Sequence, residues 1–486
     1  MGNTCGCVDQ AEKDGEVKVE NNKLMNQQNN NHRQAQINNY RDSTLSKNQF
    51  HGQAYDQSHM MFQQLFATDD PYLIDLQKTA AEQGLQYIEE LAFENGAVYK
   101  GYLLNEMRHG PGVQVWPDNA KYEGEWRENK ANGRGKFWHA DGDIYEGEWE
   151  DDKANGYGIY IHVNGAQYEG YWKNDLQDGQ GMESWQDGSK YEGGYKEGMK
   201  HGHGKYVWND GSMYEGEWCE NKINGRGIYV WPDGRKYDGE WRDNNMHGKG
   251  VYTWVNGEVY DGEWRQGLKH GYGIWRGLSC DSYIGEWYES KAHGYGVHTW
   301  KNGDRYEGEW KMCLKHGTGT DLFSNGDSYT GEYFDGKPEG KGQYSWSNGA
   351  TYIGDFKAGL KEGKGRWRSG IGPVCNSYEG DYDNDRKNGY GIFQWSSGNV
   401  YKGEYKDDER DGYGEMYWTD GSSYQGEWIK GIQHGYGKMV FPDGTKKEGY
   451  FENNVYKMSV KISDEQEPPQ SRLQHFEDSP EAKKNN

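Results

Sequence analysis

The feature that most constrains this chain is a 23-residue interval between equivalent tyrosines, which persists through most of its length. One interval covers residues 214–236, and the next begins at Tyr237. The spacing extends back to Tyr99 and forward to Tyr352, and it resumes at Tyr378 after three inserted residues. A repeat of this length and number predicts an array of stacked, similar units rather than several unrelated domains.

Each interval contains two segments in which large and small residues occupy every second position. In residues 214–218, Tyr, Gly and Trp alternate with two glutamates, and in residues 225–231, Gly, Gly, Tyr and Trp stand at alternate positions. This is the period of a strand with one buried face. Each repeat is therefore predicted to be a β-hairpin. Its reversals are expected at the Asn-Gly pair 224–225 and the Asp-Gly pair 233–234, because glycine accepts a positive φ.

The predicted fold class is all-β: an elongated, single antiparallel β-meander of about fifteen stacked 23-residue hairpins. Aromatic residues and glycines are expected on one face, where rings pack over glycine, and Glu, Lys and Asp on the other. Four rings bury too little surface to order one unit alone, so neighbouring units must stack. The candidate packing aromatics are Tyr122, Trp126, Tyr145, Trp149, Tyr214, Trp218, Tyr229, Trp231, Tyr237, Trp241, Tyr424 and Trp428. The candidate packing glycines are Gly124, Gly133, Gly135, Gly216, Gly225, Gly227 and Gly234.

The composition agrees with a thin, repeated core. Only 33% of residues are hydrophobic, whereas 15% are aromatic and 73 are glycine. The cysteines of the array fall at unrelated positions of the repeat, which predicts no disulfide or zinc framework. The sequence shows neither a signal peptide nor an apolar run of membrane-spanning length, so we expect an intracellular, reducing compartment.

The N-terminal segment predicts a lipid-anchored tether. Residues 1–70 are rich in Asn and Gln and are expected to be disordered. After removal of Met1, Gly2 is a candidate for myristoylation, although the usual Ser or Thr at the sixth position is glycine here. Cys5 and Cys7 are candidates for palmitoylation, which would supply the second anchor that one myristoyl chain requires.

The remaining boundaries follow from changes in pattern. Residues 71–95 are expected to form an amphipathic capping helix, from Pro71 to about Leu91, because Leu, Ile and Ala recur there at helical spacing. Residues 96–460 form the array, and residues 461–486 are predicted to be a disordered tail. An unpaired edge strand at the end of the array would allow the chain to form a homodimer.

The repeat offers several residue types with catalytic potential, and we interpret all of them as structural. Recurring Glu-x-Glu pairs predict a solvated acidic face, and Gly-x-Gly pairs within hairpins lack the strand-to-helix context of a phosphate loop. Equivalent histidines are about 10 Å apart, too far to share a metal, and are expected to be turn residues. These histidines are His109, His201, His247, His270, His293, His316 and His434. We therefore predict no enzyme activity, metal or cofactor, and the net charge of −23 argues against nucleic-acid binding.

The motif Tyr-Glu-Gly-Glu-Trp, followed by Asn-Gly-x-Gly and aromatic-x-Trp-x-Asp-Gly, resembles the MORN repeat. The resemblance covers about three quarters of the chain. It implies a scaffold at membranes, cilia or the cortical cytoskeleton, with cytoskeletal or ciliary proteins as partners and phospholipid as a further candidate ligand. Alternatives that the resemblance leaves open are an axonemal component similar to radial-spoke heads and a targeting partner of a phosphatidylinositol-phosphate kinase.

Overall fold

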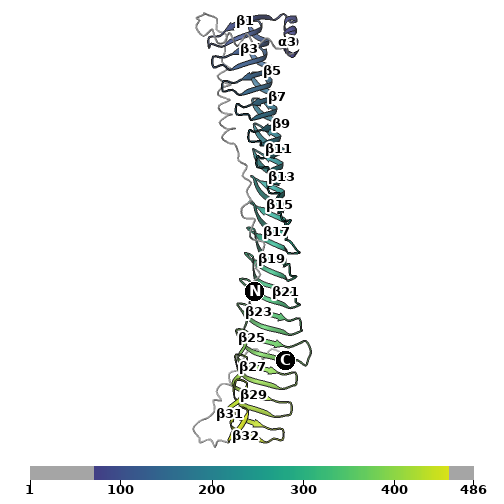
Figure 1. Cartoon of the computed structure of the whole chain (residues 1–486), viewed down its shortest axis with the longest axis vertical. Coiled ribbons are helices and arrows are strands. Elements are labelled where there is room, and N and C mark those ends of the chain that lie inside the picture. The colour runs from purple at the N-terminus through teal and green to yellow at the C-terminus, as the bar shows by residue number, and fades with distance from the viewer. Residues whose placement is uncertain (1–70, 459–486) are drawn as a thin grey trace, which may run out of the picture. The chain divides into compact units, whose positions relative to one another are not determined.

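Consecutive antiparallel β-strands make up nearly all of the described protein. The computed structural model describes residues 71–458, with side chains from residue 74 to residue 457. Thirty-three strands belong to one sheet (Figure 1), in which β1 pairs with β2 and β32 with β33 in the order of the chain. The prediction of an all-β antiparallel meander preceded by one helix is confirmed.

The bounds of the elements repeat with the period of the sequence. The helix is α3 (Pro71–Glu82). The strands are β1 (Gln86–Ala92), β2 (Val98–Leu104), β3 (Met107–Val115), β4 (Lys121–Arg127), β5 (Lys130–Trp138), β6 (Ile144–Glu150), β7 (Lys153–Ile161), β8 (Gln167–Lys173), β9 (Leu176–Ser184), β10 (Lys190–Lys196), β11 (Met199–Val207), β12 (Met213–Cys219), β13 (Lys222–Val230), β14 (Lys236–Arg242), β15 (Asn245–Thr253), β16 (Val259–Arg265), β17 (Leu268–Arg276), β18 (Ser282–Tyr288), β19 (Lys291–Thr299), β20 (Arg305–Lys311), β21 (Leu314–Leu322), β22 (Ser328–Phe334), β23 (Lys337–Ser345), β24 (Thr351–Lys357), β25 (Leu360–Arg368), β26 (Ser377–Asp383), β27 (Arg386–Gln394), β28 (Val400–Lys406), β29 (Glu409–Tyr417), β30 (Ser423–Ile429), β31 (Ile432–Val440), β32 (Lys446–Glu452) and β33 (Val455–Met458).

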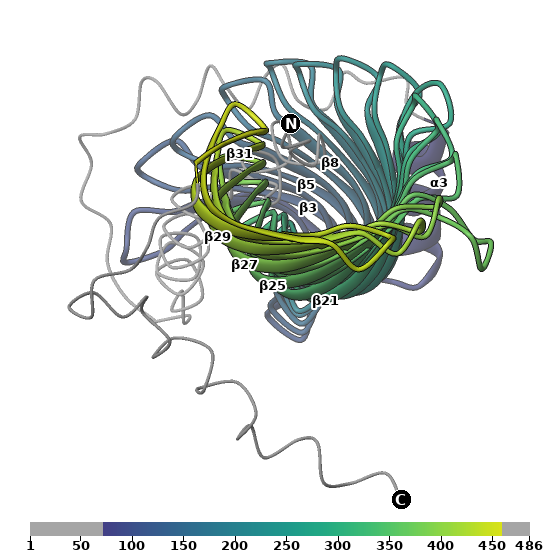
Figure 2. The same cartoon turned by 90° about the horizontal axis from the view of Figure 1, so that it is seen from below.

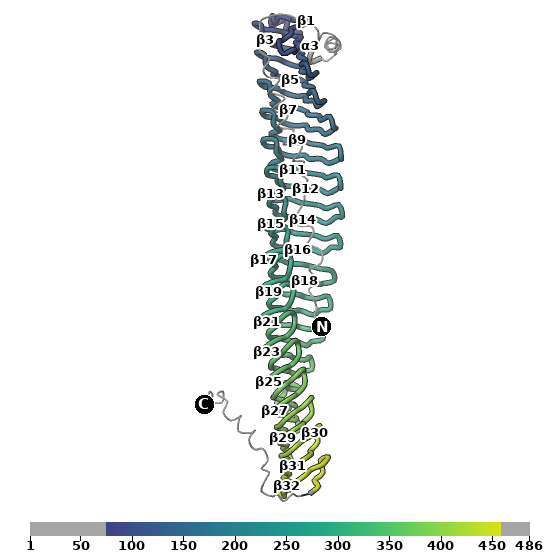
Figure 3. Tube along the Cα trace, turned by 90° about the vertical axis from the view of Figure 1, so that its left-hand side faces the viewer, coloured from purple at the N-terminus to yellow at the C-terminus, as the bar shows by residue number. Residues whose placement is uncertain are grey.

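The described chain divides into two compact units, with β18 at the division. The N-terminal unit contains α3 and the strands up to β17, and the C-terminal unit contains the strands from β19 onward. In the N-terminal unit the hairpins follow one another in chain order (Figure 3). In the C-terminal unit the strands are strongly bent along their length (Figure 2).

The first reversal of each hairpin lies four residues earlier than predicted. In the repeat that begins at Tyr214, β12 and β13 are joined by Glu220 and Asn221, whose φ angles of 50° and 63° match the two left-handed residues of a type I′ turn. Gly225 also has a left-handed φ, of 62°, but it lies inside β13 at a β-bulge. The longer strand of the hairpin places its extra residues at this bulge, so the Asn-Gly pair marks the bulge and not the turn.

The second reversal is placed as predicted. The amide of Gly234 donates to the carbonyl of Trp231 (2.9 Å), and the amide of Trp231 donates to the carbonyl of Arg235 (2.9 Å). Gly234 has a φ of 93°, which glycine adopts without a steric penalty. The same pair of hydrogen bonds recurs in most other repeats, at the turn that joins one hairpin to the next.

The predicted capping helix is wrong in its second half. The helix α3 ends at Glu82, Gly84 follows with a φ of 73°, and residues 86–92 form β1 instead. Strand β1 pairs with β2 and so satisfies backbone groups that the edge of β2 would otherwise leave open. The helix contacts β3, where Ala80 and Leu85 lie against Gly110.

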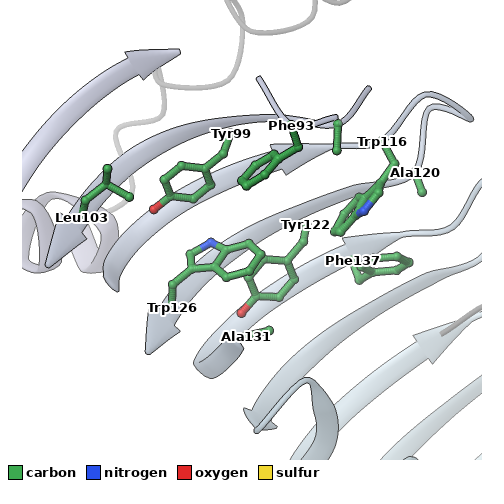
Figure 4. Close-up of a cluster of buried hydrophobic side chains, with 10 residues drawn as sticks. Phe93, Tyr99, Leu103, Trp116, Ala120, Tyr122, Trp126, Ala131 and Phe137 are labelled. Atoms are coloured by element: carbon green, nitrogen blue, oxygen red, sulfur yellow. The ribbon is translucent and has the colours of Figure 1, made fainter. Parts of the chain in front are cut away.

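The core of each unit is a layer of aromatic side chains on one face of the sheet. Figure 4 shows its N-terminal end, where Tyr99, Tyr122 and Trp126 lie side by side. The Trp126 ring meets Tyr122 edge-on at 5.0 Å and Tyr99 edge-on at 5.6 Å. Each tryptophan therefore contacts the tyrosines of its own repeat and of the preceding one, which is why no repeat has a core of its own.

Candidate functional site

The sheet has two faces, and each is a candidate for function. We call the face that carries Tyr214, Gly216 and Trp218 and their equivalents the aromatic face. We call the opposite face, which carries Glu215 and Glu217 and their equivalents, the charged face. In β12 the aromatic-face residues are buried and the charged-face residues are exposed, in strict alternation.

On the aromatic face, each opening tyrosine is enclosed by its own repeat. Tyr214 is 0% exposed, and a Cβ added at Gly227 would lie 2.5 Å from its ring. The Tyr214 hydroxyl donates to the carbonyl of Glu217 (3.0 Å). Burial, with the nearby Glu217 charge, raises the pKa of the Tyr214 hydroxyl, so this group stays protonated at every physiological pH. These tyrosines are packing residues and are not accessible to a ligand.

The tryptophans join each repeat to its neighbour. The Nε1 of Trp218 donates to the carbonyl of Gly204 (3.1 Å), and Trp241 makes the same bond to Gly227 (3.1 Å). Tyr214 meets Trp218 and Trp241 edge-on at 5.3 and 5.7 Å. Such pairs add about 0.5–1.5 kcal/mol each beyond the surface that they bury.

The other predicted packing residues occupy equivalent places. Buried side chains on the aromatic face are Tyr122, Trp126, Tyr145, Tyr229, Tyr237, Trp241, Tyr424 and Trp428, whereas Trp149 and Trp231 are half-buried. The glycines beneath the tyrosine rings are Gly124, Gly135, Gly216 and Gly227, those at the bulges are Gly133 and Gly225, and Gly234 lies in the second reversal. The candidate lipidation residues Gly2, Cys5 and Cys7, the tether and the C-terminal tail lie outside the described residues.

The second glutamate of each Glu-x-Glu pair closes the bulge, a role that the sequence interpretation missed. The Glu125 carboxylate accepts the amide of Arg134 (2.8 Å), and a Cβ added at Gly133 would lie 2.5 Å from it. Glu309 accepts the amide of Thr318 (2.9 Å), and this hydrogen bond lowers the pKa of the Glu309 carboxyl. The available signal in the sequence was a Glu that recurs directly after the strand glycine and eight residues before the bulge glycine, as Glu125 follows Gly124 and precedes Gly133.

The recurrent histidines lie in strands and not in turns, which corrects the prediction. His201 lies within β11 and His247 within β15, each directly before a bulge glycine. Burial, with the nearby Arg242 charge, lowers the pKa of His247. Among residues 71–458, the His, Cys, Asp and Glu side chains form no group of three or more that could hold a metal ion.

Two buried polar clusters interrupt the aromatic layer, and sequence analysis did not identify either. In one, the carboxylate of Glu183 accepts the Tyr195 hydroxyl (2.9 Å) and the Lys200 ammonium (3.2 Å). The Lys200 ammonium also lies over the Trp185 ring at 4.9 Å, a favourable cation–π geometry. Burial and the Glu183 charge raise the pKa of the Tyr195 hydroxyl well above its ordinary value.

The second cluster repeats this chemistry in the C-terminal unit. The Asp321 carboxylate accepts the Tyr333 hydroxyl (2.7 Å) and the Lys315 ammonium (2.7 Å). In both clusters an acid replaces the usual buried aromatic residue, and a tyrosine replaces the tryptophan that most other repeats carry. Both replacements are visible in the sequence, but only the pairing of neighbouring repeats shows that the acidic side chain and the tyrosine contact each other.

A third buried carboxylate joins two consecutive loops. Asp143 accepts the Tyr160 hydroxyl (2.7 Å), the Val163 amide (2.9 Å) and a hydrogen bond from the His162 ring (3.0 Å). Burial alone would raise the pKa of Asp143, but these three hydrogen bonds outweigh it and hold the pKa well below its ordinary value. The carboxylate form is therefore the stable one in the folded protein.

This geometry gives a pH-dependent stability. Because the pKa of Asp143 is depressed by folding, its contribution is fully present above the unfolded pKa of about 3.9 and is lost as the pH falls toward the folded value. Asp143→Asn should lower the free energy of unfolding at pH 7 by about 1–3 kcal/mol, and by less at pH 3. Urea denaturation at both pH values measures this difference. Glu146→Gln, in an exposed ion pair with Lys136, is the control and should change stability by less than about 1 kcal/mol.

Comparison with known families explains the repeat. A family model for the MORN repeat matches fifteen consecutive segments, which begin with the opening tyrosines and together cover more than half of the chain. The chain belongs to the MORN-repeat family. The matched segments of the MORN array are residues 99–121, 122–144, 145–167, 168–190, 191–213, 214–234, 237–259, 260–277, 283–305, 306–328, 329–351, 352–372, 378–400, 401–423 and 424–446. The MORN repeat is a structural scaffold repeat whose members mediate protein or membrane interactions.

Several solved structures are distantly similar to this MORN protein. The TCP domain of SAS-4 (dCPAP) from Drosophila melanogaster, in complex with a proline-rich motif of Ana2, has 13% identity and a TM-score of 0.22 over 36% of this chain and 94% of that chain. The TCP10 domain of Danio rerio CPAP, in complex with a STIL peptide, has 11% identity and a TM-score of 0.17 over 56% of this chain and 94% of that chain. A streptogramin B lyase has 13% identity and a TM-score of 0.11 over 55% of this chain and 81% of that chain. A search of curated proteins gave no significant match.

A membrane-spanning helix is not found in the part of the chain that the structure describes. The helix α3 has 12 residues, and no described helix is both long and apolar enough to cross a bilayer.

Proposed function

We propose that this MORN protein is a non-enzymatic scaffold that binds other proteins along its repeats at the cytoplasmic face of the plasma or cortical membrane. One observation supports the scaffold role above all. The recurrent residues with catalytic potential are engaged in holding the sheet together, as the Tyr214 hydroxyl and the Glu125 carboxylate illustrate. The charged face, by contrast, repeats an exposed surface many times and can present several partners in a fixed order.

The proposed membrane attachment is a double acyl anchor on Gly2, Cys5 and Cys7. Its support is the N-terminal sequence Met-Gly-Asn-Thr-Cys-Gly-Cys, which places two thiols beside the candidate myristoylation site. A single myristoyl chain binds a bilayer with only about 10⁴ M⁻¹, so stable attachment needs the second acyl group. Electrostatics do not replace it, since the chain carries 78 acidic residues against 55 basic ones.

Metabolic labelling tests the anchor directly. Cells expressing the full chain should incorporate alkyne-myristate, and Gly2→Ala should abolish the label and move the protein from the membrane fraction to the soluble fraction. Cys5→Ser combined with Cys7→Ser should remove alkyne-palmitate label, whereas Cys219→Ser, which removes an exposed cysteine of the array, should leave it unchanged. Wild-type protein that takes up neither label and is unaffected by Gly2→Ala would refute the anchor.

The location of the protein distinguishes the scaffold from the ciliary alternative. A C-terminally tagged chain should concentrate at the plasma membrane or the cortical cytoskeleton, and Gly2→Ala should disperse it. Labelling along the axoneme that persists in Gly2→Ala would instead identify an axonemal component similar to radial-spoke heads. Co-purification of the tagged chain with a phosphatidylinositol-phosphate kinase would instead identify the chain as a targeting partner of that kinase.

A further inference from the structure

Three consecutive repeats of the C-terminal unit carry tyrosine at the same position of the charged face. Tyr390, Tyr413 and Tyr436 lie on β27, β29 and β31, directly after the bulge glycine of each strand. Tyr413 is 41% exposed, and the other two are partly exposed. Elsewhere in the array this position holds Pro111, Arg134, Tyr157, Gln180, His203, Arg226, Lys249, Tyr272, Tyr295, Thr318, Lys341 and Lys364. Packing of the repeat therefore does not require tyrosine there.

The spacing of this tyrosine row is set by the sheet. Successive members are two strands apart, which corresponds to about 9.6 Å along the hydrogen-bonding direction. A polyproline II helix has three residues per turn and a rise of about 3.1 Å per residue, so equivalent residues recur about every 9.3 Å. An extended proline-rich segment that crosses the strands would therefore meet one tyrosine per turn.

The strands that lie between β27, β29 and β31 carry glutamates in register with the tyrosines. Glu404 on β28 is the register partner of Tyr390, and Glu427 on β30 is the register partner of Tyr413. Both are second glutamates of their repeats, and their carboxylates lie beside the bulge glycines Gly412 and Gly435 on the charged face. Aromatic rings and carboxylates thus alternate across the strands, and this pattern favours a ligand that combines proline with Lys or Arg.

Side chains next to the tyrosine row add a further aromatic ring, and the lysines nearby are engaged with other residues. Tyr450 is the register partner of Tyr436, and their rings meet edge-on at 5.9 Å. Lys402 lies over the Tyr417 ring, and the nearby Lys438 is paired with Glu448 at 3.7 Å. The surface is therefore aromatic and acidic.

We infer that the tyrosine row Tyr390–Tyr413–Tyr436 is a docking surface for a proline-rich segment that carries basic residues and adopts the polyproline II conformation. The tyrosine rings pack against the prolines, and Glu404 and Glu427 attract the basic side chains. This inference deepens the proposed scaffold role, because it names the kind of partner that one part of the array binds. It does not depend on the acyl anchor.

Binding of a synthetic peptide to the purified full chain tests the inference. The probe is a fluorescent (Pro-Pro-Arg)4 peptide followed by anisotropy. Two control peptides separate shape from charge: (Gly-Ser-Arg)4 keeps the charge but is flexible, and (Pro-Pro-Glu)4 keeps the conformation but reverses the charge. The inference predicts saturable binding of (Pro-Pro-Arg)4 and affinities at least about tenfold weaker for both controls. Failure of (Pro-Pro-Arg)4 to bind, or equal binding of (Gly-Ser-Arg)4, would overturn it.

Substitutions taken from other repeats locate the surface. Tyr413→Arg, which copies Arg226, should weaken binding about tenfold or more, and Tyr413→Thr, which copies Thr318, should do the same without adding charge. Tyr157→Arg makes the same change in the N-terminal unit and should leave binding unchanged. Unaltered affinity in both Tyr413 variants, with wild-type circular dichroism, would refute the assignment. Because the measurement uses purified protein, its failure would leave the acyl anchor and the cellular location untouched.

Discussion

Alanine in place of Gly216 is expected to disrupt the repeat around it, although the change adds only one methyl group. A Cβ at this position would lie 2.4 Å from the Cα of Gly227 and 2.5 Å from the Tyr214 hydroxyl oxygen. Real Cβ atoms do not approach backbone so closely, so the strands or the buried ring must move. We expect a loss of about 3 kcal/mol or more in the free energy of unfolding.

Urea denaturation followed by tryptophan fluorescence measures this loss, and hydrogen exchange shows whether it is confined to the neighbouring repeats. Gly370→Ala is a matched control, because a Cβ there meets nothing within 4 Å and the glycine does not have a left-handed φ. The control should differ from wild type by less than about 0.5 kcal/mol. A Gly216→Ala protein as stable as Gly370→Ala would show that the tyrosine ring does not rest on the glycine.

Lys200→Met is expected to destabilise the N-terminal unit by about 3–5 kcal/mol, because it leaves the Glu183 carboxylate buried without its cation. The array provides the apolar alternative one repeat later, where Tyr206, Trp218 and Ile223 occupy the positions of Glu183, Tyr195 and Lys200. The triple variant Glu183→Tyr, Tyr195→Trp, Lys200→Ile should therefore be at least as stable as wild type.

The midpoints of urea unfolding of the single and triple variants test this pair of expectations. A small loss, under about 1 kcal/mol, in Lys200→Met would show that the ion pair contributes little. A triple variant as unstable as Lys200→Met would show that the aromatic layer cannot continue through this repeat. Near-ultraviolet circular dichroism reports whether the added tryptophan and tyrosine pack in one defined arrangement.

The period of the sequence was enough to predict the sheet, because each strand follows from local alternation. Tyr214, Gly216 and Trp218 reach the same face for any chain that is extended there. The position of the first reversal could not be found in this way. A left-handed glycine fits both a turn and a bulge, and only the register between β12 and β13 decides that Gly225 belongs to a bulge.

Interactions between repeats account for what the sequence did not predict. Residues 86–92 have apolar residues at helical spacing, yet they form β1 because the edge of β2 offers backbone partners. Likewise, Glu183 on β9 and Lys200 on β11 are 17 residues apart and meet only when β10 pairs with both strands. Local patterns carry no information about such partners.

The hydrogen bond from each tryptophan to the preceding repeat has a consequence for how such a chain changes in length. Trp218 and Trp241 make the same bond across the same sequence separation, so removal of residues 214–236 would present Trp241 to Gly204 in an equivalent geometry. Removal of residues 191–213 would instead delete Lys200 and leave Glu183 without its cation. We therefore expect the fold to tolerate gain or loss of a whole repeat where the aromatic layer is regular. Repeats that share a buried polar cluster must instead keep their neighbours.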